Sequence, residues 1–128
     1  MNFYKGINGL KMSDMIISLD QGSSSSRAAL IEARTGKIIA KKFVSVPFEA
    51  SQNTVSYDGA ALFNTQMEAL QEMLDYTGSG QIKAIALTAQ RSTIVLWDKE
   101  TGSALCPILS WLDGRAAQIS ALNPLSQE

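Results

Sequence analysis

The sequence predicts an α/β protein in which a mixed β-sheet is covered by helices. Three observations lead to this prediction. Three strand-like segments follow one another through short turns between residues 15 and 46, a helical pattern occupies residues 58–76, and a further apolar strand begins at residue 82. Strands that are joined first by hairpins and then across a helix form a mixed sheet, and the strict βαβα order of a doubly wound fold is missing.

The first three strands are predicted from apolar runs and turn residues. Residues 15–20 form a short apolar run that ends in a carboxylate, residues 21–26 form a tight turn, and residues 27–32 form the second strand. Residues 33–36 make another turn, in which Gly36 supplies a positive φ. Residues 37–46 are rich in β-branched and apolar side chains, so we expect a third strand that ends before Pro47.

A polar loop is expected over residues 48–57, and a helix after it. Asp58 belongs to the residue types that cap helix N-termini, and the helical pattern continues to about residue 76. Residues 77–80 contain two glycines and are expected to end the helix. The apolar positions recur at helical spacing and form one face. They are Leu62, Ala69, Leu70, Met73 and Leu74.

The rest of the chain is predicted as short strands that lead into a helix. Residues 82–89 and 93–97 form strands, and a polar interruption at residues 90–92 separates them. A hairpin turn at residues 98–102, a short strand within 105–109 and a helical start over 113–122 follow. We therefore expect a polar leader at residues 1–14, part of one domain at 15–122, and a C-terminal end at 123–128 typical of a truncation.

Composition excludes several classes of function. The 128 residues are 45% apolar and 18% charged, which is typical of globular proteins, and the net charge of −1 offers no general attraction to nucleic acid. The sequence has no histidine, so a histidine base or metal ligand is excluded, and its single cysteine excludes an internal disulfide. No run approaches the roughly 18 apolar residues of a membrane span. We expect a cytoplasmic protein without nucleic-acid or membrane partners.

The most informative segment is residues 20–27, with the sequence DQGSSSSR. Asp20 ends a strand, where its carboxylate can hold Mg²⁺ directly or through water. Gly22 permits a close turn whose N–H groups can cradle phosphate oxygens, and the serines and Arg27 add donors. The turn lies between two strands and lacks Gly-Lys-Ser/Thr, so it is not a Walker loop. A plain hairpin turn explains the same residues without a ligand.

Two further segments carry polar and aromatic side chains suited to a hydroxylated ligand. Gln90 and Arg91 follow a buried strand and can hydrogen-bond several hydroxyls of a polyol. Trp111 precedes Asp113 and Arg115, a combination that suits stacking on a sugar. Taken alone, the first segment is better explained as a polar turn. The second is better explained as a core tryptophan followed by a helix N-cap.

Together, the three segments resemble the N-terminal portion of the FGGY family of carbohydrate kinases. Residues 17–28 (ISLDQGSSSSRA) resemble the first phosphate motif of the family. Residues 89–93 (AQRST), with the hairpin after them, resemble the corresponding segment of the glycerol kinase branch, which is the most similar branch. Residues 109–115 (LSWLDGR) resemble the Trp-x-Asp-x-Arg segment of the family, and residues 113–115 are more like the xylulokinase branch.

The resemblance implies an actin-like, ribonuclease H-type fold that holds ATP and Mg²⁺ between two such domains. It also implies transfer of the γ-phosphate to a hydroxyl of a sugar or polyol. Asp20 would lie near Mg²⁺. The nucleotide phosphates would face Ser23, Ser24, Ser25 and Arg27. The sugar or polyol would be contacted by Gln90, Arg91, Ser92, Trp111 and Asp113.

The resemblance also implies what this chain lacks. Ser92 stands where glycerol kinases have a glutamate that holds glycerol, so the resemblance leaves open which sugar or polyol is the acceptor. The catalytic Asp and the adenine site of the family belong to a C-terminal domain outside this sequence. We therefore expect no catalytic residue here and little or no kinase activity from this chain alone.

Two other functions remain open at this stage. The chain is alternatively a non-catalytic nucleotide- or sugar-binding or regulatory module derived from such a kinase. An actin-like assembly protein has less support, because the second and third segments resemble kinases specifically. A domain face that normally packs against the rest of an enzyme is apolar, and such surfaces drive association. We therefore expect a homo-oligomer.

Overall fold

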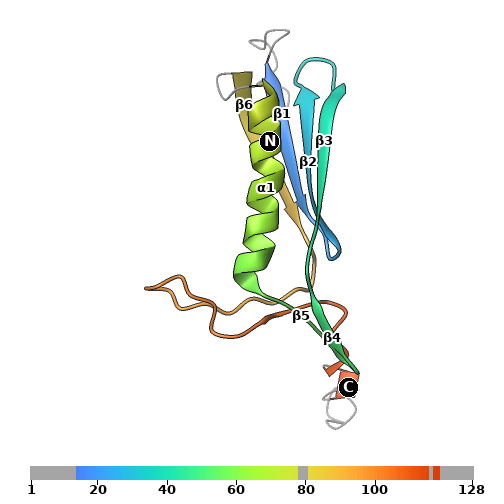
Figure 1. The fold of residues 1–128 in the computed structure, drawn as a ribbon, viewed down its shortest axis with the longest axis vertical. Helices are drawn as coiled ribbons and strands as arrows, with labels where there is room; N and C mark the ends of the chain where they lie inside the picture. The colour runs from blue at the N-terminus through green and yellow to red at the C-terminus, as the bar shows by residue number, and fades with distance from the viewer. Residues whose placement is uncertain (1–13, 78–80, 116, 119–128) are drawn as a thin grey trace, which may run out of the picture.

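The computed structural model describes residues 14–77, 81–115 and 117–118. It contains a four-stranded sheet with one long helix on one face, and a smaller three-stranded sheet at one end (Figure 1). The predictions for the leader at 1–13, for the helix end at 78–80 and for residues 119–128 lie outside the described residues.

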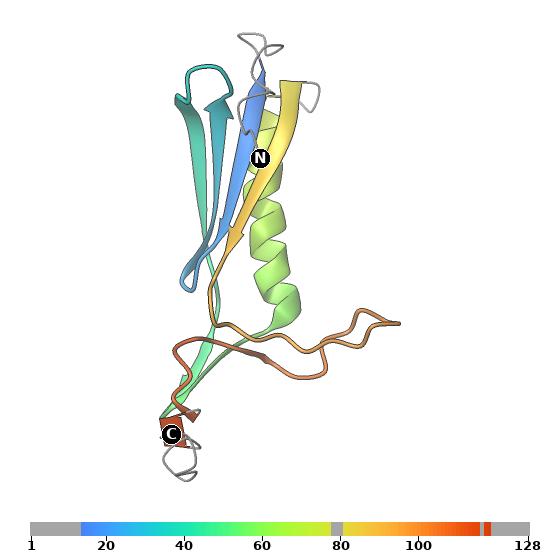
Figure 2. The ribbon, with the colours of Figure 1, turned by 180° about the vertical axis from the view of Figure 1, so that it is seen from behind.

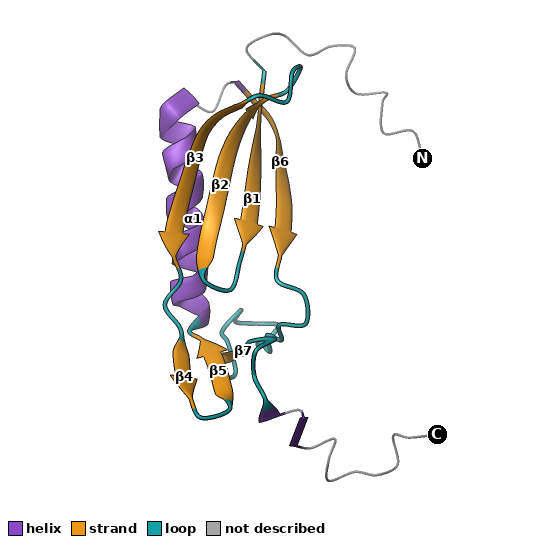
Figure 3. Cartoon of the chain, turned by 90° about the vertical axis from the view of Figure 1, so that its right-hand side faces the viewer, coloured by secondary structure: helices purple, strands orange, loops and turns teal. Residues whose placement is uncertain are grey.

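The larger sheet confirms the mixed topology that the sequence predicts. Its strands are β1 (Met15–Gln21), β2 (Ser25–Glu32), β3 (Ile38–Ser45) and β6 (Ile82–Ala89), in the spatial order β3-β2-β1-β6. Neighbours β1–β2 and β2–β3 are antiparallel, while β1 and β6 are parallel (Figure 3). The helix α1 (Gly59–Thr77) lies in the connection from β3 to β6, as a parallel pair requires.

The helix begins and packs as predicted. The Oδ1 atom of Asp58 accepts a hydrogen bond from the N–H of Ala61 at 2.7 Å, which is N-cap geometry. Ala69 and Met73 on its apolar face are buried against the sheet. The sheet side of this core consists of Ile17, Leu19, Ala28 and Leu30. Burial of each larger side chain contributes roughly 1.5–3 kcal/mol, so this contact is the main source of stability.

Strand β6 lies at the open edge of the sheet and is not covered by the helix. Helix α1 packs against β2 and β3 and also contacts β1. By contrast, β6 is exposed from Lys83 to Ala89, and Figure 2 shows its outer edge free. Ile85 and Leu87 are among the exposed large apolar side chains. The sheet therefore has a covered part and an uncovered part.

The polar loop predicted for residues 48–57 is wrong. This segment forms β4 (Glu49–Ser51) and β5 (Thr54–Tyr57), which pair antiparallel, and β5 also pairs with β7 (Ile108–Leu109). Tyr57 is buried with Val46 and Ile108 in a second small core. Burial of a tyrosine by residues distant in sequence orders a segment whose local composition is polar.

The strand predicted at residues 93–97 is also wrong. Only the isolated bridges Ile94–Leu109 and Trp97–Ala104 form, and the strand expected within 105–109 shortens to β7. This hairpin projects away from the main sheet, so no neighbouring strand offers a continuous ladder (Figure 2). Its turn is confirmed, because Gly102 has φ 72° and donates its N–H to the Asp98 carbonyl at 2.8 Å.

Candidate functional site

The turn between β1 and β2 carries a charged pair on the face opposite the helix. Asp20 and Arg27 are paired positions across the two strands. Arg27 Nη1 donates to Asp20 Oδ2 at 3.1 Å, and Arg27 Nε donates to Ser25 Oγ at 3.0 Å. Both charged side chains remain partly exposed. A carboxylate and a guanidinium are therefore presented side by side at the end of the sheet.

The backbone of this turn is tightly held. The N–H of Gly22 donates to the Ser25 carbonyl at 3.0 Å, and the Ser24 carbonyl accepts from Val46 N–H at 3.0 Å. A Cβ atom at position 22 would lie 2.9 Å from the Ser25 carbonyl oxygen, so glycine is required here. Among the hydrogen bonds of the described residues, none uses the N–H of Ser23 or Ser24. These donors remain for a ligand.

The fourth serine has a different role, which the sequence analysis missed. Ser26 is fully buried, its Oγ donates to Gln21 Oε1 at 2.9 Å, and it lies 2.7 Å from Thr65 Oγ1 on α1. The alternation of β2 contains the signal, since Ser26 shares its face with the buried Ala28 and Leu30. Ser26 therefore anchors the turn to the helix.

The turn, the end of β6 and the segment before residue 112 line one open cavity of about 670 Å³. This cavity brings together seven of the predicted site residues. They are Asp20, Ser23, Arg27, Gln90, Arg91, Ser92 and Trp111. Ser24, Ser25 and Asp113 do not line it. Residues about 70 and 90 positions apart in sequence thus meet at one end of the sheet.

A second cavity of about 490 Å³ adjoins the first and shares Ser92 and Trp111 with it. Ser92 has φ 58°, a left-handed conformation that is uncommon for residues other than glycine. Trp111 is 54% exposed, so the alternative of a core tryptophan is wrong. Asp113 and Arg115 line this second cavity together with Ile94.

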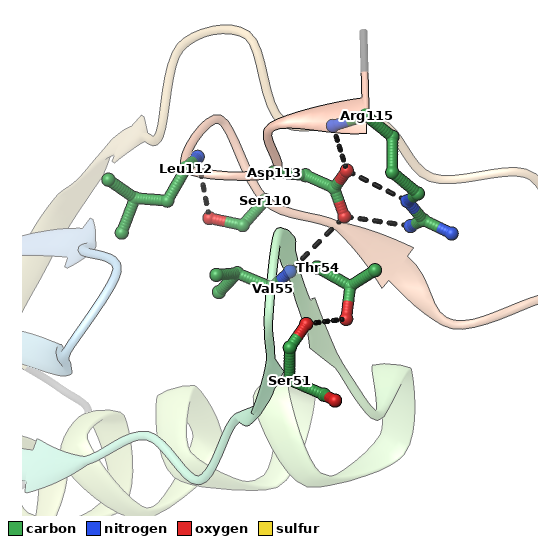
Figure 4. A network of polar contacts seen from close by, with 7 residues as sticks. All are labelled: Ser51, Thr54, Val55, Ser110, Leu112, Asp113 and Arg115. Atoms are coloured by element: carbon green, nitrogen blue, oxygen red, sulfur yellow. Dashed lines mark hydrogen bonds and ion pairs between the residues drawn. The ribbon is translucent and has the colours of Figure 1, made fainter. Parts of the chain in front are cut away.

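Asp113 fixes the segment that carries Trp111 (Figure 4). Its carboxylate accepts two hydrogen bonds from the Arg115 guanidinium, at 2.7 and 2.8 Å, and one from the Arg115 N–H at 3.1 Å. It also accepts from the N–H of Val55 on β5 at 3.2 Å. The hydrogen bonds from the Arg115 side chain hold the pKa of Asp113 well below its usual range. This carboxylate therefore connects residues 110–115 to β5.

The donor set suits a magnesium ion only in company with phosphate. In the part of the chain that the structure describes, no three His, Cys, Asp or Glu side chains gather into a metal site. Mg²⁺ keeps several waters and is commonly held by one or two carboxylates and substrate phosphates. Asp20, which lines the same cavity as Ser23, fits that arrangement.

Comparisons with known proteins agree on one family. The sequence model of the N-terminal domain of the FGGY family of carbohydrate kinases matches residues 15–124. The chain is 38% identical over 112 residues to the glycerol kinase of Natranaerobius thermophilus, covering 84% of this chain and 22% of that protein. It is 38% identical over 105 residues to the glycerol kinase of Mycoplasma mycoides subsp. mycoides SC, covering 80% and 21%. The chain thus spans about a fifth of the length of these curated relatives.

Solved structures show the same fold. A glycerol kinase of Plasmodium falciparum with ADP superposes with a TM-score of 0.77 at 17% identity, over 90% of this chain and 24% of that one. A gluconate kinase from Lactobacillus acidophilus superposes with a TM-score of 0.78 at 19% identity, over 88% and 22%. At these identities the likeness establishes the fold alone, which is the ribonuclease H-like fold of actin and hexokinase.

Proposed function

This chain belongs to the FGGY family of carbohydrate kinases, and we propose that it supplies the phosphate-binding turn and part of the acceptor site of an ATP-dependent sugar or polyol kinase. The observation that supports this proposal is the single cavity on which three separate segments converge. A plain hairpin turn would not require a polar strand end and an exposed tryptophan to lie against it.

On the phosphate side, we assign the binding groups to the β1–β2 turn. The N–H groups of Ser23 and Ser24 would donate hydrogen bonds to phosphate oxygens, with the hydroxyl of Ser25 and the Arg27 guanidinium as further donors. Mg²⁺, when bound with the nucleotide, would neutralise charge on the phosphates, and Asp20 would hold it. Without nucleotide, Arg27 forms an ion pair with Asp20, so the two charges balance each other.

On the acceptor side, we assign Gln90, Arg91, Ser92 and Trp111 to a sugar or polyol. Arg91 offers several N–H donors to hydroxyl oxygens, and Trp111 offers an exposed apolar face. Asp113 would contribute indirectly, by fixing the segment before it. The small Ser92 leaves the two cavities adjoining, which gives room for an acceptor larger than glycerol.

We also propose that phosphoryl transfer requires groups from a further domain. Phosphoryl transfer depends on positioning and charge neutralisation around both reacting oxygens. The proposed sites supply these for one side of the cleft, and no general base is assigned within them. The 128-residue chain alone should therefore show little or no kinase activity. Robust ATP-dependent phosphorylation of any member of a sugar and polyol panel would contradict this.

The decisive experiment is a calorimetric titration with Mg·ATP and Mg·ADP. We expect binding by the wild-type chain and at least roughly tenfold weaker binding by Asp20→Ala, because the Mg²⁺ ligand is lost. Asp75→Ala, which removes an exposed carboxylate of α1, is the matched control and should bind like the wild type. No binding by the wild type at millimolar nucleotide would reject a working phosphate turn.

A non-catalytic binding or regulatory module is the second candidate. The openness of the cavity and Ser92 in the acceptor position favour it. Binding of nucleotide or sugar that is never followed by transfer, even with the remaining kinase domain supplied as a separate polypeptide, would support the module. We propose a cytoplasmic location for the protein. Separately, no helix among the described residues has the length and apolar character needed to cross a membrane.

A further inference from the structure

Gln90 joins the two sides of the cavity through its side-chain amide. Its Nε2 donates to the Gly22 carbonyl at 3.0 Å, and its Oε1 accepts from Thr93 Oγ1 at 3.0 Å. Gln90 follows β6, whereas Gly22 lies in the β1–β2 turn, 68 positions earlier. A chain of hydrogen bonds therefore runs from the acceptor segment to the turn.

Both backbone polar groups of Gly22 are hydrogen-bonded within the protein. Its carbonyl oxygen accepts from two glutamine amides, Gln21 Nε2 at 3.1 Å and Gln90 Nε2 at 3.0 Å. Its N–H is already committed to the Ser25 carbonyl. Gln21 is itself bonded by the buried Ser26, so that bond comes from the covered part of the sheet. The bond from Gln90 connects the turn to the end of β6, which belongs to the uncovered part of the sheet.

We infer that Gln90 is a positioning residue that sets the conformation of the phosphate turn from the acceptor side. This role is additional to the sugar contact proposed above, because the amide oxygen and only one of the two amide hydrogens of Gln90 are used within the protein. The consequence for nucleotide binding rests on the proposed function, while the consequence for the turn itself does not. Thr93 orients the amide, so its effect should act through Gln90.

Three variants separate these hydrogen bonds. Gln90→Glu keeps the shape and the acceptor for Thr93 but cannot donate to Gly22. Gln90→Met keeps the length and removes both bonds. Thr93→Val keeps the shape and removes only the orienting hydroxyl. Gln71→Met is the matched control, because Gln71 donates to Asp75 in an exposed pair on α1.

The first readout is hydrogen exchange of the Gly22 N–H, measured by NMR with the core amide of Ile17 as an internal reference. We expect exchange at Gly22 to rise at least about fivefold in Gln90→Glu and Gln90→Met, to rise less in Thr93→Val, and to stay unchanged in Gln71→Met. In the Gln90→Met background, Thr93→Val should cause no further rise in exchange at Gly22. If the two residues acted independently, their effects would add. If Gln90→Met or Thr93→Val also raises exchange at Ile17, that variant is left out, and the comparison uses Gln90→Glu at a temperature at which the fold is more stable.

The second readout is the affinity for Mg·ADP, which we expect to fall about fivefold to tenfold in Gln90→Glu and Gln90→Met. Unchanged exchange at Gly22 in both Gln90 variants would overturn the inference. Altered exchange with no Mg·ADP binding by any protein, the wild type included, would support the positioning role and reject the proposed function. Altered exchange with unchanged affinity would overturn the link between the turn and the nucleotide.

Discussion

The covered and uncovered parts of the main sheet have the same sequence pattern and different environments. Leu19 on β1 and Leu87 on β6 are paired positions on one face, yet Leu19 is 4% exposed and Leu87 is 77% exposed. Ile17 and Ile85 repeat the contrast, at 0% and 47%. Alternation of apolar residues therefore determines which way a side chain points. Whether a second layer covers it depends on where the helix lies.

The candidate site lies on the boundary between these parts. The β1–β2 turn is anchored in the covered part through Ser26 and Thr65, whereas Arg91, Ser92 and Trp111 belong to exposed segments. One wall of the cavity is therefore built into the core, and the other is fixed by individual hydrogen bonds. Local opening of the structure should begin on the second wall.

The largest test of the comparison is a matched pair of substitutions, Leu19→Ala and Leu87→Ala. Leu19→Ala should lower the free energy of unfolding by about 3 kcal/mol, because it leaves a cavity in the core. Leu87→Ala should change it by less than about 0.5 kcal/mol, as is usual for an exposed position. Urea unfolding of both variants measures the difference. Equal losses would mean that Leu87 is covered in solution.

Self-association tests whether the uncovered strand β6 binds another copy of the chain. The open edge of β6 combines unpaired main-chain groups with exposed apolar side chains, so we expect the chain to form oligomers. Leu87→Lys should weaken the association at least about tenfold, because it places a charge on this edge. Phe63→Lys, at an exposed aromatic of helix α1, is the control. Sedimentation velocity of a wild-type chain that is monomeric at every concentration would contradict the prediction.

The stability of the helix that covers one part of the sheet should depend on its N-cap. Asp58→Ala removes the acceptor for Ala61 N–H and should cost about 1 kcal/mol of stability. Asp75→Ala lies on the exposed side of the same helix and should cost much less. Thermal unfolding followed by circular dichroism compares the two. A similar loss for both would show that the cap is not the cause.

The smallest expected effect is a pH dependence that originates in Asp113, which ties the segment after β7 to β5. The pKa of Asp113 is lowered in the folded chain by the Arg115 hydrogen bonds, while in the unfolded chain it is near 3.9. The unfolded state therefore binds a proton first as the pH falls below about 4, and the contribution of Asp113 to stability is lost. Asp113→Asn should show a shallower decline between pH 4 and 2 in urea unfolding. An identical slope would exclude Asp113 as its source.

The parts of the fold that were predictable are those with local signals. The strands β1, β2 and β3, the helix after Asp58 and strand β6 follow from apolar alternation, turn glycines and helical spacing. The β4–β5 hairpin was missed because its order comes from Tyr57, which packs against Ile108 some 50 residues away. The strand expected at residues 93–97 failed for the opposite reason. Its composition is strand-like, but among the described residues it pairs only at two isolated bridges, which do not extend into a ladder.

The site was predictable as a set of segments but not as a set of contacts. Asp20, Arg91 and Trp111 were among the predicted site residues, and one cavity contains them. Ser23, Ser24 and Ser25 were all predicted to face the phosphates, but of the four serines only Ser23 lines the cavity. Ser26, for which no role was predicted, is buried and faces the helix. The hydrogen bond from Gln90 to Gly22 joins the ends of two neighbouring strands that are 68 positions apart in sequence, so it has no local signature. Roles that depend on such distant partners require coordinates.

The strand order β3-β2-β1-β6 has a consequence for how the chain folds during synthesis. The three-stranded meander is built from neighbours in sequence, so its loops close at little entropic cost as soon as residue 45 has emerged. Strand β6 pairs with β1 across more than 60 residues, and such long-range pairing is slow. We therefore expect the β1–β2 turn to form early on the ribosome, before β6 has paired with the second edge of β1.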